Sequence, residues 1–260
     1  MPYAPSPFRV TKYGKYISYF LEALKRNDLE TIKDSMNYVL FKKLPKTDRL
    51  VTTEMGSFML RRSTTDFQFV NFSYEKEVKS YLGSISKDIG LFIDIGACIG
   101  EYAIWMANKH IPTVAIEPVN YEAIIENLGW NNAINEYITI FACAAGKENK
   151  KVAFNVLEGV TSSSHLNHAE LGTIECKKLD ELVPFKNINQ DKLTVIKLDV
   201  EGMEIDALLG ATNILTYVKN LHIIYEYCSC GDENIRRILN RYGDFKYKDL
   251  DGVNTLAIKM

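Results

Sequence analysis

Apolar and polar positions alternate in a repeating order from residue 91 to near the C-terminus. Short runs of apolar and β-branched residues are followed by longer stretches in which apolar residues recur every three or four positions. The runs predict strands at residues 91–95, 113–116, 138–143, 193–198 and 221–225, with helices between most of them. Strands and helices that alternate in this way form a mostly parallel sheet with helices on both faces. The expected fold class is therefore α/β.

The N-terminal third of the chain has a different pattern. Apolar residues at helical spacing form two sets within residues 8–44, which predicts two helices packed as a cover. Between residues 50 and 72, β-forming residues predict a hairpin, and a helix over about 75–82 follows. We therefore expect two units: an N-terminal helical and β-hairpin cover at residues 1–85 and an α/β domain at residues 86–260.

The alternation of strands and helices breaks between the third and fourth predicted strands. This interval holds a predicted hairpin strand at residues 152–156 and a polar loop at 161–165. Ser164 and His165 lie in that loop and are candidate substrate contacts, although a plain solvated turn is the alternative. Residues 245–258 predict a hairpin that closes the domain.

Composition limits the class of protein. The hydrophobic content of 47% is that of a globular protein, and no apolar run approaches the roughly 18 residues of a membrane span. The first residues lack the features of a secretory signal, so we expect a cytoplasmic location by default. The five cysteines include no C-x-x-C pair, and an odd number argues against a complete disulfide framework.

The charge of the chain argues against a nucleic-acid partner. The net charge is -2, and the excess of lysine and arginine is confined to the first fifty residues. A protein that binds nucleic acid usually shows a positive footprint. We interpret this basic segment as a solvated helical face.

A glycine-containing turn follows the first strand of the α/β domain, in the sequence DIGACIG. Gly96 and Gly100 allow a tight turn and a close approach to a ligand. The dinucleotide fingerprint would need a further glycine where Asp94 or Cys98 stands, which counts against NAD. An acid at Asp94 would repel a diphosphate, whereas it would attract the ammonium group of a methionine moiety.

A second acid follows the next strand, in the sequence AIEP. Glu117 comes 23 positions after Asp94, close to the roughly 20 expected for an acid that binds ribose hydroxyls. The two motifs stand in register with two successive strands. Together they predict a pocket for a cofactor that carries both a ribose and a positive charge.

These motifs, with LDVEGMEIDALLGA further on, resemble the FkbM-type methyltransferases, a branch of the class I S-adenosylmethionine-dependent family. The resemblance spans about residues 74–226, with Cys98 in place of the usual asparagine. It implies a Rossmann-like, seven-stranded, mostly parallel sheet whose last strand is antiparallel. It also implies S-adenosylmethionine as cofactor, methylation of an oxygen nucleophile, and cofactor contacts from Asp94, Gly96, Ala97, Gly100, Glu117, Pro118 and, near the adenine, Ala144.

The catalytic candidates follow the fourth strand. Asp199 stands at its carboxyl end, where ligands bind in open α/β sheets. A carboxylate there can take the proton of an acceptor hydroxyl, so Asp199 is the first candidate for general base. The alternative is that Asp199 only positions substrate or caps the next helix. Lys197 shares its face and is a candidate to orient it or a snorkelling side chain, and Glu201 is a candidate substrate contact.

Glu226 ends the fifth predicted strand and is the second candidate for base or substrate contact. Asp199 and Glu226 together raise the hypothesis of a Mg²⁺ site, because both are hard oxygen donors. No histidine or third acid at fixed spacing supports it, so we predict no metal ligands.

The function expected is O-methylation of a hydroxyl on a sugar, glycan or secondary metabolite, with a small molecule or glycan as acceptor. The alternatives are an RNA or protein methyltransferase, a non-catalytic binding subunit with the same fold, and an NAD-dependent dehydrogenase. The chain has no Pro-Pro or Pro-Cys dipeptide, which weakens the case for a base-modifying enzyme. The sequence identifies neither the acceptor nor the oligomeric state.

Overall fold

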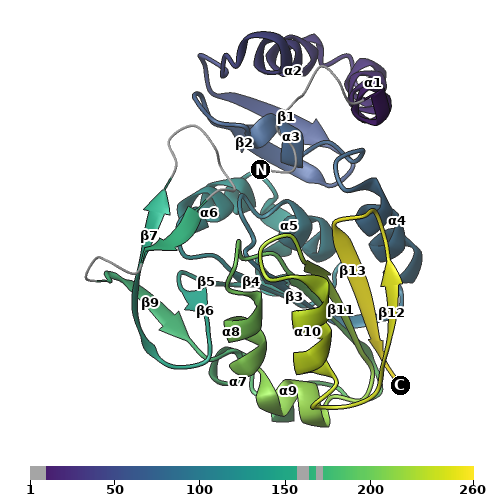
Figure 1. The fold of residues 1–260 in the computed structure, drawn as a ribbon. Coiled ribbons are helices and arrows are strands. Elements are labelled where there is room, and N and C mark those ends of the chain that lie inside the picture. Colours follow the sequence, from purple (N-terminus) through teal and green to yellow (C-terminus); the bar gives the residue numbers. More distant parts are fainter. Residues whose placement is uncertain (1–9, 157–163, 168–171) are drawn as a thin grey trace.

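A computed structural model describes residues 10–156, 164–167 and 172–260 (Figure 1). Within these residues a seven-stranded sheet forms the centre of the molecule. Its strands lie in the order β12 (Phe245–Asp249), β13 (Asn254–Lys259), β11 (Leu221–Glu226), β10 (Leu193–Leu198), β3 (Ile89–Ile95), β4 (Thr113–Ile116) and β5 (Ile138–Phe141).

The last strand along the chain, β13, is the antiparallel strand of the sheet. β11, β10, β3, β4 and β5 pair in parallel, whereas β13 pairs antiparallel with both β11 and β12. β12 therefore runs in the same direction as the parallel strands. This is the Rossmann-like class I methyltransferase topology expected from the sequence, and the expectation is confirmed.

Alternate residues of the strands face two separate cores, as the period of two requires. One core holds Phe92 and Val195 and packs against α4 (Lys76–Ile85), α5 (Glu101–Ala107) and α6 (Tyr121–Gly129). The other holds Ile93 and Ile196. It packs against four helices on the opposite face of the sheet: α7 (Leu179–Leu182), α8 (Glu204–Leu209), α9 (Thr212–Tyr217) and α10 (Asp232–Leu239).

The N-terminal cover consists of α1 (Val10–Lys25), α2 (Leu29–Phe41), a hairpin of β1 (Arg49–Thr53) and β2 (Gly56–Leu60), and α3 (Asp66–Phe69). The hairpin is held on α6, because the Asn127 side chain accepts a hydrogen bond from the Met59 backbone N–H at 2.7 Å. Apolar side chains of the hairpin, such as Phe58, belong to the same core as α5 and α6. The cover and the first face of the sheet thus share one hydrophobic core.

One sequence expectation about this cover is wrong. Phe67 and Phe69 were expected in the second half of the hairpin, and they lie in the short helix α3 instead. The Asp66 carboxylate accepts hydrogen bonds from the Arg61 backbone N–H (3.0 Å) and side-chain Nε (2.8 Å), which turns the chain after β2. Both phenylalanines still reach the core, with 3% and 5% of their surface exposed.

A second, four-stranded sheet interrupts the alternation of strands and helices. It consists of β6 (Ala144–Ala145), β9 (Ile174–Lys177), β7 (Lys150–Val156) and β8 (Ser164–Asn167). The expected hairpin strand corresponds to β7. The expected polar loop is only partly correct, because Ser164 and His165 pair with β7 as part of β8 while residues 161–163 lie outside the described residues. Backbone pairing holds this segment, so it needs no run of apolar side chains.

Two short 3₁₀ helices, η1 (Asn132–Tyr137) and η2 (Phe185–Asn187), complete the secondary structure of the described chain. None of the helices in the described residues has the length and apolar character needed to cross a bilayer.

Candidate active site

The carboxyl ends of four adjacent parallel strands meet at one edge of the sheet. Asp94 lies in β3, Glu117 directly after β4, Asp199 directly after β10, and Glu226 at the end of β11. Asp94 and Lys197 occupy paired positions on β3 and β10, and the Asp199 backbone N–H donates to the Ile95 carbonyl at 3.0 Å. This is the edge at which open α/β sheets bind their ligands.

The glycine turn after β3 packs directly against the end of β10. Gly96 has a φ of +84°, and a Cβ there would lie 1.8 Å from the Asp199 carbonyl oxygen. Gly100 also has a φ of +84° and is the N-cap residue directly before α5. Both positions therefore require glycine, for backbone conformation and, at Gly96, for space. Cys98 between them has a φ of 53°, a left-handed conformation that asparagine adopts more readily than other side chains.

Asp94 is a buried carboxylate without a protein partner. It is 1% exposed, and neither of its carboxylate oxygens has a hydrogen-bond partner among the described residues. Burial raises its pKa to about 7, against the opposing effect of Lys197. A buried polar atom without a partner is costly and calls for a ligand that would supply one. The ammonium group of S-adenosylmethionine fits that requirement in charge and in hydrogen-bonding capacity.

Glu117 joins β4 to the glycine turn. Its Oε2 accepts a hydrogen bond from the Cys98 backbone N–H at 3.0 Å, and its Oε1 accepts from the backbone N–H groups of Val119 (2.8 Å) and Asn120 (2.9 Å). Burial raises the pKa of this carboxyl, while the three N–H donors act in the opposite direction. A carboxylate can accept about four hydrogen bonds, so it retains capacity for a ribose hydroxyl.

The remaining predicted cofactor residues surround these two acids along the chain. The Ala97 backbone N–H donates to the Ile116 carbonyl at 3.2 Å, which fixes the glycine turn against β4. Pro118 follows Glu117 directly. Ala144 begins β6 just beyond the end of β5 and is buried. The structure thus brings the predicted cofactor residues to the ends of β3, β4 and β5, with their contacts to a cofactor still a prediction.

Lys197 and Asp199 form an ion pair at the end of β10. The Lys197 Nζ lies 3.2 Å from the Asp199 Oδ2, and the lysine is buried while the aspartate side chain is 27% exposed. Burial alone would lower the pKa of Lys197, but nearby carboxylates, Asp199 first, raise it well above its ordinary value. Lys197 also lies 4.8 Å from the centre of the Tyr102 ring. The snorkelling alternative for Lys197 is therefore wrong, because its ammonium lies inside the protein.

Glu226 adjoins Asp199 from the next strand. Burial, and next the neighbouring Asp199 carboxylate, raise the pKa of Glu226 to about 9. Glu201 has a left-handed backbone, with a φ of 48°, and its charge contributes to the raised pKa of Glu226. Asp199 thus lies between its ion-pair partner Lys197 and a second carboxyl group, that of Glu226.

The magnesium hypothesis gains no support. Over the described ranges, the structure contains no group of three or more histidine, cysteine, aspartate or glutamate side chains arranged to hold a metal ion.

A set of buried charges behind the site was not anticipated from the sequence. Glu101 is 4% exposed, its Oε2 has no partner among the described residues, and burial raises its pKa to about 8. Tyr102 donates a hydrogen bond to Glu75 at 2.7 Å. Lys79 is fully buried and donates to backbone carbonyls, including that of Tyr74 at 2.7 Å, and burial lowers its pKa to about 8. In the sequence, the acid directly after Gly100, which is Glu101, is the feature from which a buried charge here could have been predicted.

Ser164 and His165 do not join this arrangement by any described contact. They belong to β8 in the smaller sheet, and their side chains lie outside the described residues. Their role as substrate contacts stays a prediction.

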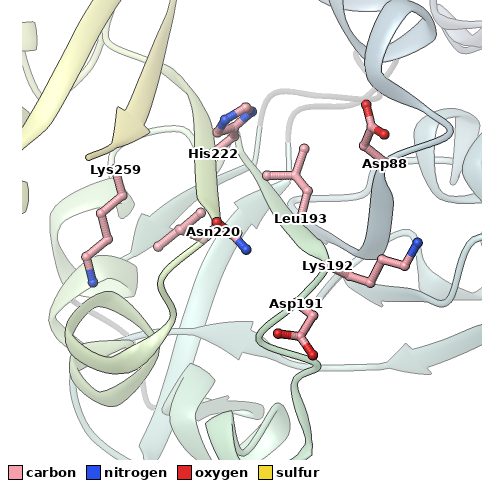
Figure 2. A pocket seen from close by; sticks show the side chains of 8 residues that line it. Asp88, Asp191, Lys192, Leu193, Asn220, His222 and Lys259 are labelled. Atoms are coloured by element: carbon pink, nitrogen blue, oxygen red, sulfur yellow. The ribbon is translucent and has the colours of Figure 1, made fainter.

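A cavity of about 360 Å³ lies at the opposite edge of the sheet (Figure 2). It is lined by the amino ends of β10 and β11, including Leu193 and His222, and by Lys259 at the end of β13. The His222 Nδ1 and the Tyr81 hydroxyl are 2.6 Å apart, and Lys259 donates to three carbonyls at the C-terminal end of α9, such as that of Val218 at 3.0 Å. The contacts of these polar groups are with the protein's own chain, and the cavity lies at the amino ends of β10 and β11, away from the acidic carboxyl ends of the strands.

The chain matches one family model, described as the methyltransferase FkbM domain, over residues 94–246. No curated protein sequence is detectably similar to it. Among solved structures, it is similar to a methyltransferase FkbM from Methylobacillus flagellatus, with 20% identity and a TM-score of 0.48 over 75% of this chain and 53% of that one.

Two other solved structures are similar at lower identity. A tRNA (uracil-54, C5)-methyltransferase from Pyrococcus abyssi, in complex with S-adenosyl-L-homocysteine, has 10% identity and a TM-score of 0.43 over 82% of this chain and 44% of that one. A magnesium protoporphyrin IX methyltransferase from Synechocystis, with bound cofactor, has 13% identity and a TM-score of 0.42 over 75% and 84%. The chain spans about half the length of the first two of these proteins.

Proposed function

Because the chain belongs to the FkbM methyltransferase family, we propose that it is an S-adenosylmethionine-dependent O-methyltransferase that acts on a hydroxyl of a sugar, glycan or secondary metabolite. The observation that carries the proposal is Asp94, a buried carboxylate without a protein partner beside the turn that contains Gly96. An unpaired buried carboxylate fits a ligand that carries an ammonium group and would reject a diphosphate. This also argues against an NAD-dependent dehydrogenase.

The chain's own residues divide the binding of the cofactor between two strand ends. Asp94 would accept hydrogen bonds from the ammonium group of the methionine moiety. Glu117 would accept from the ribose, with the lone-pair capacity that its backbone contacts leave. The glycine turn would lie close to the cofactor, because neither Gly96 nor Gly100 carries a side chain.

S-adenosylmethionine, when bound, supplies an electrophilic methyl group on a sulfonium. Transfer of that methyl group to the acceptor oxygen would leave the demethylated cofactor, and the acceptor hydroxyl would have to give up its proton. Asp199 is the proposed acceptor of that proton. Its ionised form is stabilised by Lys197, and the neighbouring Glu226, whose pKa burial and the Asp199 carboxylate raise, adds a second carboxyl group to the site.

Alignment of the acceptor is the second task of these residues. An in-line displacement depends on holding the two reacting atoms in a near-attack geometry. Lys197 pairs with Asp199, and Lys197 is itself buried with its Nζ 4.8 Å from the centre of the Tyr102 ring. Asp199 would therefore be a rigid hydrogen-bond acceptor for the substrate hydroxyl as well as a base, and Glu201 is the proposed additional contact to the acceptor.

The test is methyl transfer from S-adenosylmethionine with a labelled methyl group to a panel of acceptors: sugars, oligosaccharides, hydroxylated small molecules, RNA and peptides. Label in a carbohydrate or small-molecule hydroxyl supports the proposal. Label in RNA or peptide would replace it with one of the alternative methyltransferase functions. Tight cofactor binding without transfer to any acceptor class would indicate a non-catalytic binding subunit.

A further inference from the structure

The two N-terminal helices carry exposed apolar side chains on their outer side. On α1 these are Ile17, Leu21 and Leu24, spaced at i, i+4 and i+7, which places them in one stripe. On α2 the stripe contains Leu29, Met36 and Leu40, at i, i+7 and i+11, with Phe41 next to it. Their exposed fractions range from 46% for Met36 to 66% for Leu29. We call these seven side chains the outer helical face.

The opposite sides of the same helices already serve the fold. Ala23 and Thr31 are each 1% exposed, and the Tyr38 ring packs edge-on against Phe67 with centroids 6.1 Å apart. The Asn71 side chain donates to the Tyr19 carbonyl at 3.2 Å. Packing on the described part of the chain therefore does not explain the outer helical face. In Figure 1, α1 and α2 form the end of the molecule farthest from α7 and α9.

The charges of this part of the chain are sorted by position. The acids on the inner side are used in local contacts: Glu22 accepts from the backbone N–H groups of Phe72 and Ser73, both at 2.7 Å, and Asp28 and Asp34 pair with Arg49 at 3.1 and 3.3 Å. Between residues 17 and 50, the exposed side chains that carry a charge are mostly basic. They are Lys25, Lys33, Lys42, Lys43 and Lys46, against the exposed acids Glu30 and Asp48. The basic excess of the N-terminus is thus displayed around the outer helical face.

Exposed apolar side chains together with exposed lysines favour some kinds of binding partner over others. A symmetric contact between two copies would bring the same lysines of both copies together, which is unfavourable. A nucleic acid would use the lysines but would leave seven apolar side chains without a partner. The interface of a bilayer with anionic lipid accommodates both, since apolar side chains enter the acyl boundary and lysines contact the headgroups.

We propose that the outer helical face docks the protein on the surface of a membrane that contains anionic lipid. The association is peripheral: two short amphipathic helices lie in the interface, and none of the described helices spans the bilayer. The proposal does not depend on the methyl-transfer reaction, because none of the residues involved belongs to the candidate active site.

The experiment is flotation of the full chain with vesicles of two compositions. One is phosphatidylcholine alone, and the other is phosphatidylcholine with 30 mol% phosphatidylglycerol. This fraction, roughly one lipid in three, gives the negatively charged surface to which lysines bind. We expect the fraction bound to the anionic vesicles to correspond to a partition coefficient at least about tenfold above that for the neutral vesicles. Raising the salt concentration should weaken the binding, because exposed charges are screened.

Two pairs of variants locate the surface. Leu24→Glu/Leu40→Glu should reduce binding about tenfold or more, since each places a charge in the acyl boundary. Its control is Ile125→Glu/Met260→Glu, which changes two equally exposed apolar residues elsewhere. Lys42→Gln/Lys43→Gln should weaken binding to anionic vesicles alone, with Lys186→Gln/Lys219→Gln as its control. All eight positions are exposed, and thermal unfolding of each variant verifies the fold.

Absence of binding to anionic vesicles, or equal loss of binding in the test and control variants, would overturn the proposal. Light scattering measures the oligomeric state and so tests whether a second copy of the chain covers this face. If the protein is a dimer, if Leu24→Glu/Leu40→Glu makes it a monomer, and if no vesicles are bound, the face serves self-association instead. Binding to an RNA duplex but not to vesicles would assign it to nucleic acid.

Discussion

Lys197 and Asp199 are held together at the end of β10, with the lysine Nζ 3.2 Å from the aspartate Oδ2. The lysine is buried and the aspartate is partly exposed. The Asp199 carboxylate is therefore accessible from solvent while its ion pair with the buried lysine restricts its orientation. Burial and the nearness of the same carboxylate raise the pKa of Glu226 to about 9. The arrangement suits a residue that must remain ionised and oriented while it receives a proton.

Replacement of Asp199 by asparagine should lower turnover by roughly 10²–10⁴-fold, because the amide cannot accept the proton of the acceptor. The affinity for S-adenosylhomocysteine should change little. Turnover and calorimetric affinity are measured on the same variant, with Asp191→Asn at the opposite edge of the sheet as control. Survival of turnover within a few-fold would move proton removal to another group, Glu226 first.

Binding of S-adenosylhomocysteine should depend on pH through Asp94. Its pKa is raised to about 7, and an ammonium ligand favours its ionised form, so binding releases a proton below that pH. Affinity should therefore fall by up to about tenfold per pH unit below 7 and level off above it. Asp94→Asn should bind weakly with a flatter profile. An unchanged slope in that variant would show that another group titrates on binding.

Glu117→Ala should reduce both cofactor affinity and stability. The substitution leaves three backbone N–H groups without an acceptor, and each charge-assisted hydrogen bond contributes roughly 1.5–3 kcal/mol. We expect a loss of about 3 kcal/mol in the free energy of unfolding without ligand, measured by denaturant titration. A loss of affinity with no change in stability would mean that the ribose contact dominates and the backbone contacts do not contribute.

Gly96→Ala should disrupt the joint between the glycine turn and β10. Its Cβ would meet the Asp199 carbonyl at 1.8 Å, and its φ of +84° disfavours any side chain. We expect a loss of more than about 2 kcal/mol in stability and a loss of S-adenosylhomocysteine binding. The matched variant is Gly129→Ala, whose Cβ would meet nothing within 4 Å. That variant should be neutral or more stable by up to about 1 kcal/mol, and equal behaviour of the two would contradict the packing argument.

The stability of the ligand-free protein should fall as pH rises from about 5 to 8. Glu101 and Glu226 have pKa values raised to about 8 and about 9, so the folded state binds more protons than the unfolded state above the ordinary pKa of 4.5. Their stabilising contribution is complete below that value and is lost as pH approaches the folded-state pKa. Above about 8 the buried Lys79, with its lowered pKa, acts in the opposite direction.

Urea unfolding at pH 5.5 and pH 8, at constant ionic strength, measures this dependence. Glu226→Gln should reduce the difference between the two pH values, because the amide mimics the protonated carboxyl. A free energy of unfolding that rises over this interval would show that these carboxyls are ionised in the folded protein.

The sequence predicted the strands of the main sheet well, because each is a short apolar run between turn residues. The predicted ranges 113–116 and 193–198 coincide with β4 and β10. Phe67 and Phe69 were misassigned because aromatic residues suit a strand and a buried helical turn alike, and the contacts of Asp66 with Arg61 decided between them.

The site was predictable where it depends on strand ends and not where it depends on distant contacts. Asp94, Glu117 and Asp199 follow from the positions of the strands. The contacts of the Tyr102 ring with Lys79 and Lys197, and of its hydroxyl with Glu75, join segments far apart in the sequence. No local pattern distinguishes such a lysine from a solvated one on a helix.

The position of β12 in the sheet has a consequence for how copies of the protein meet. Among the described strands β12 pairs only with β13, so its other backbone edge has N–H and C=O groups available for a further strand. Lys246 and Lys248 alternate along this edge strand and are exposed. Lysines at an edge discourage the pairing of sheets from two molecules. The lysines of β12 thus disfavour edge-to-edge aggregation, although none of the described helices or strands covers the free edge of this strand.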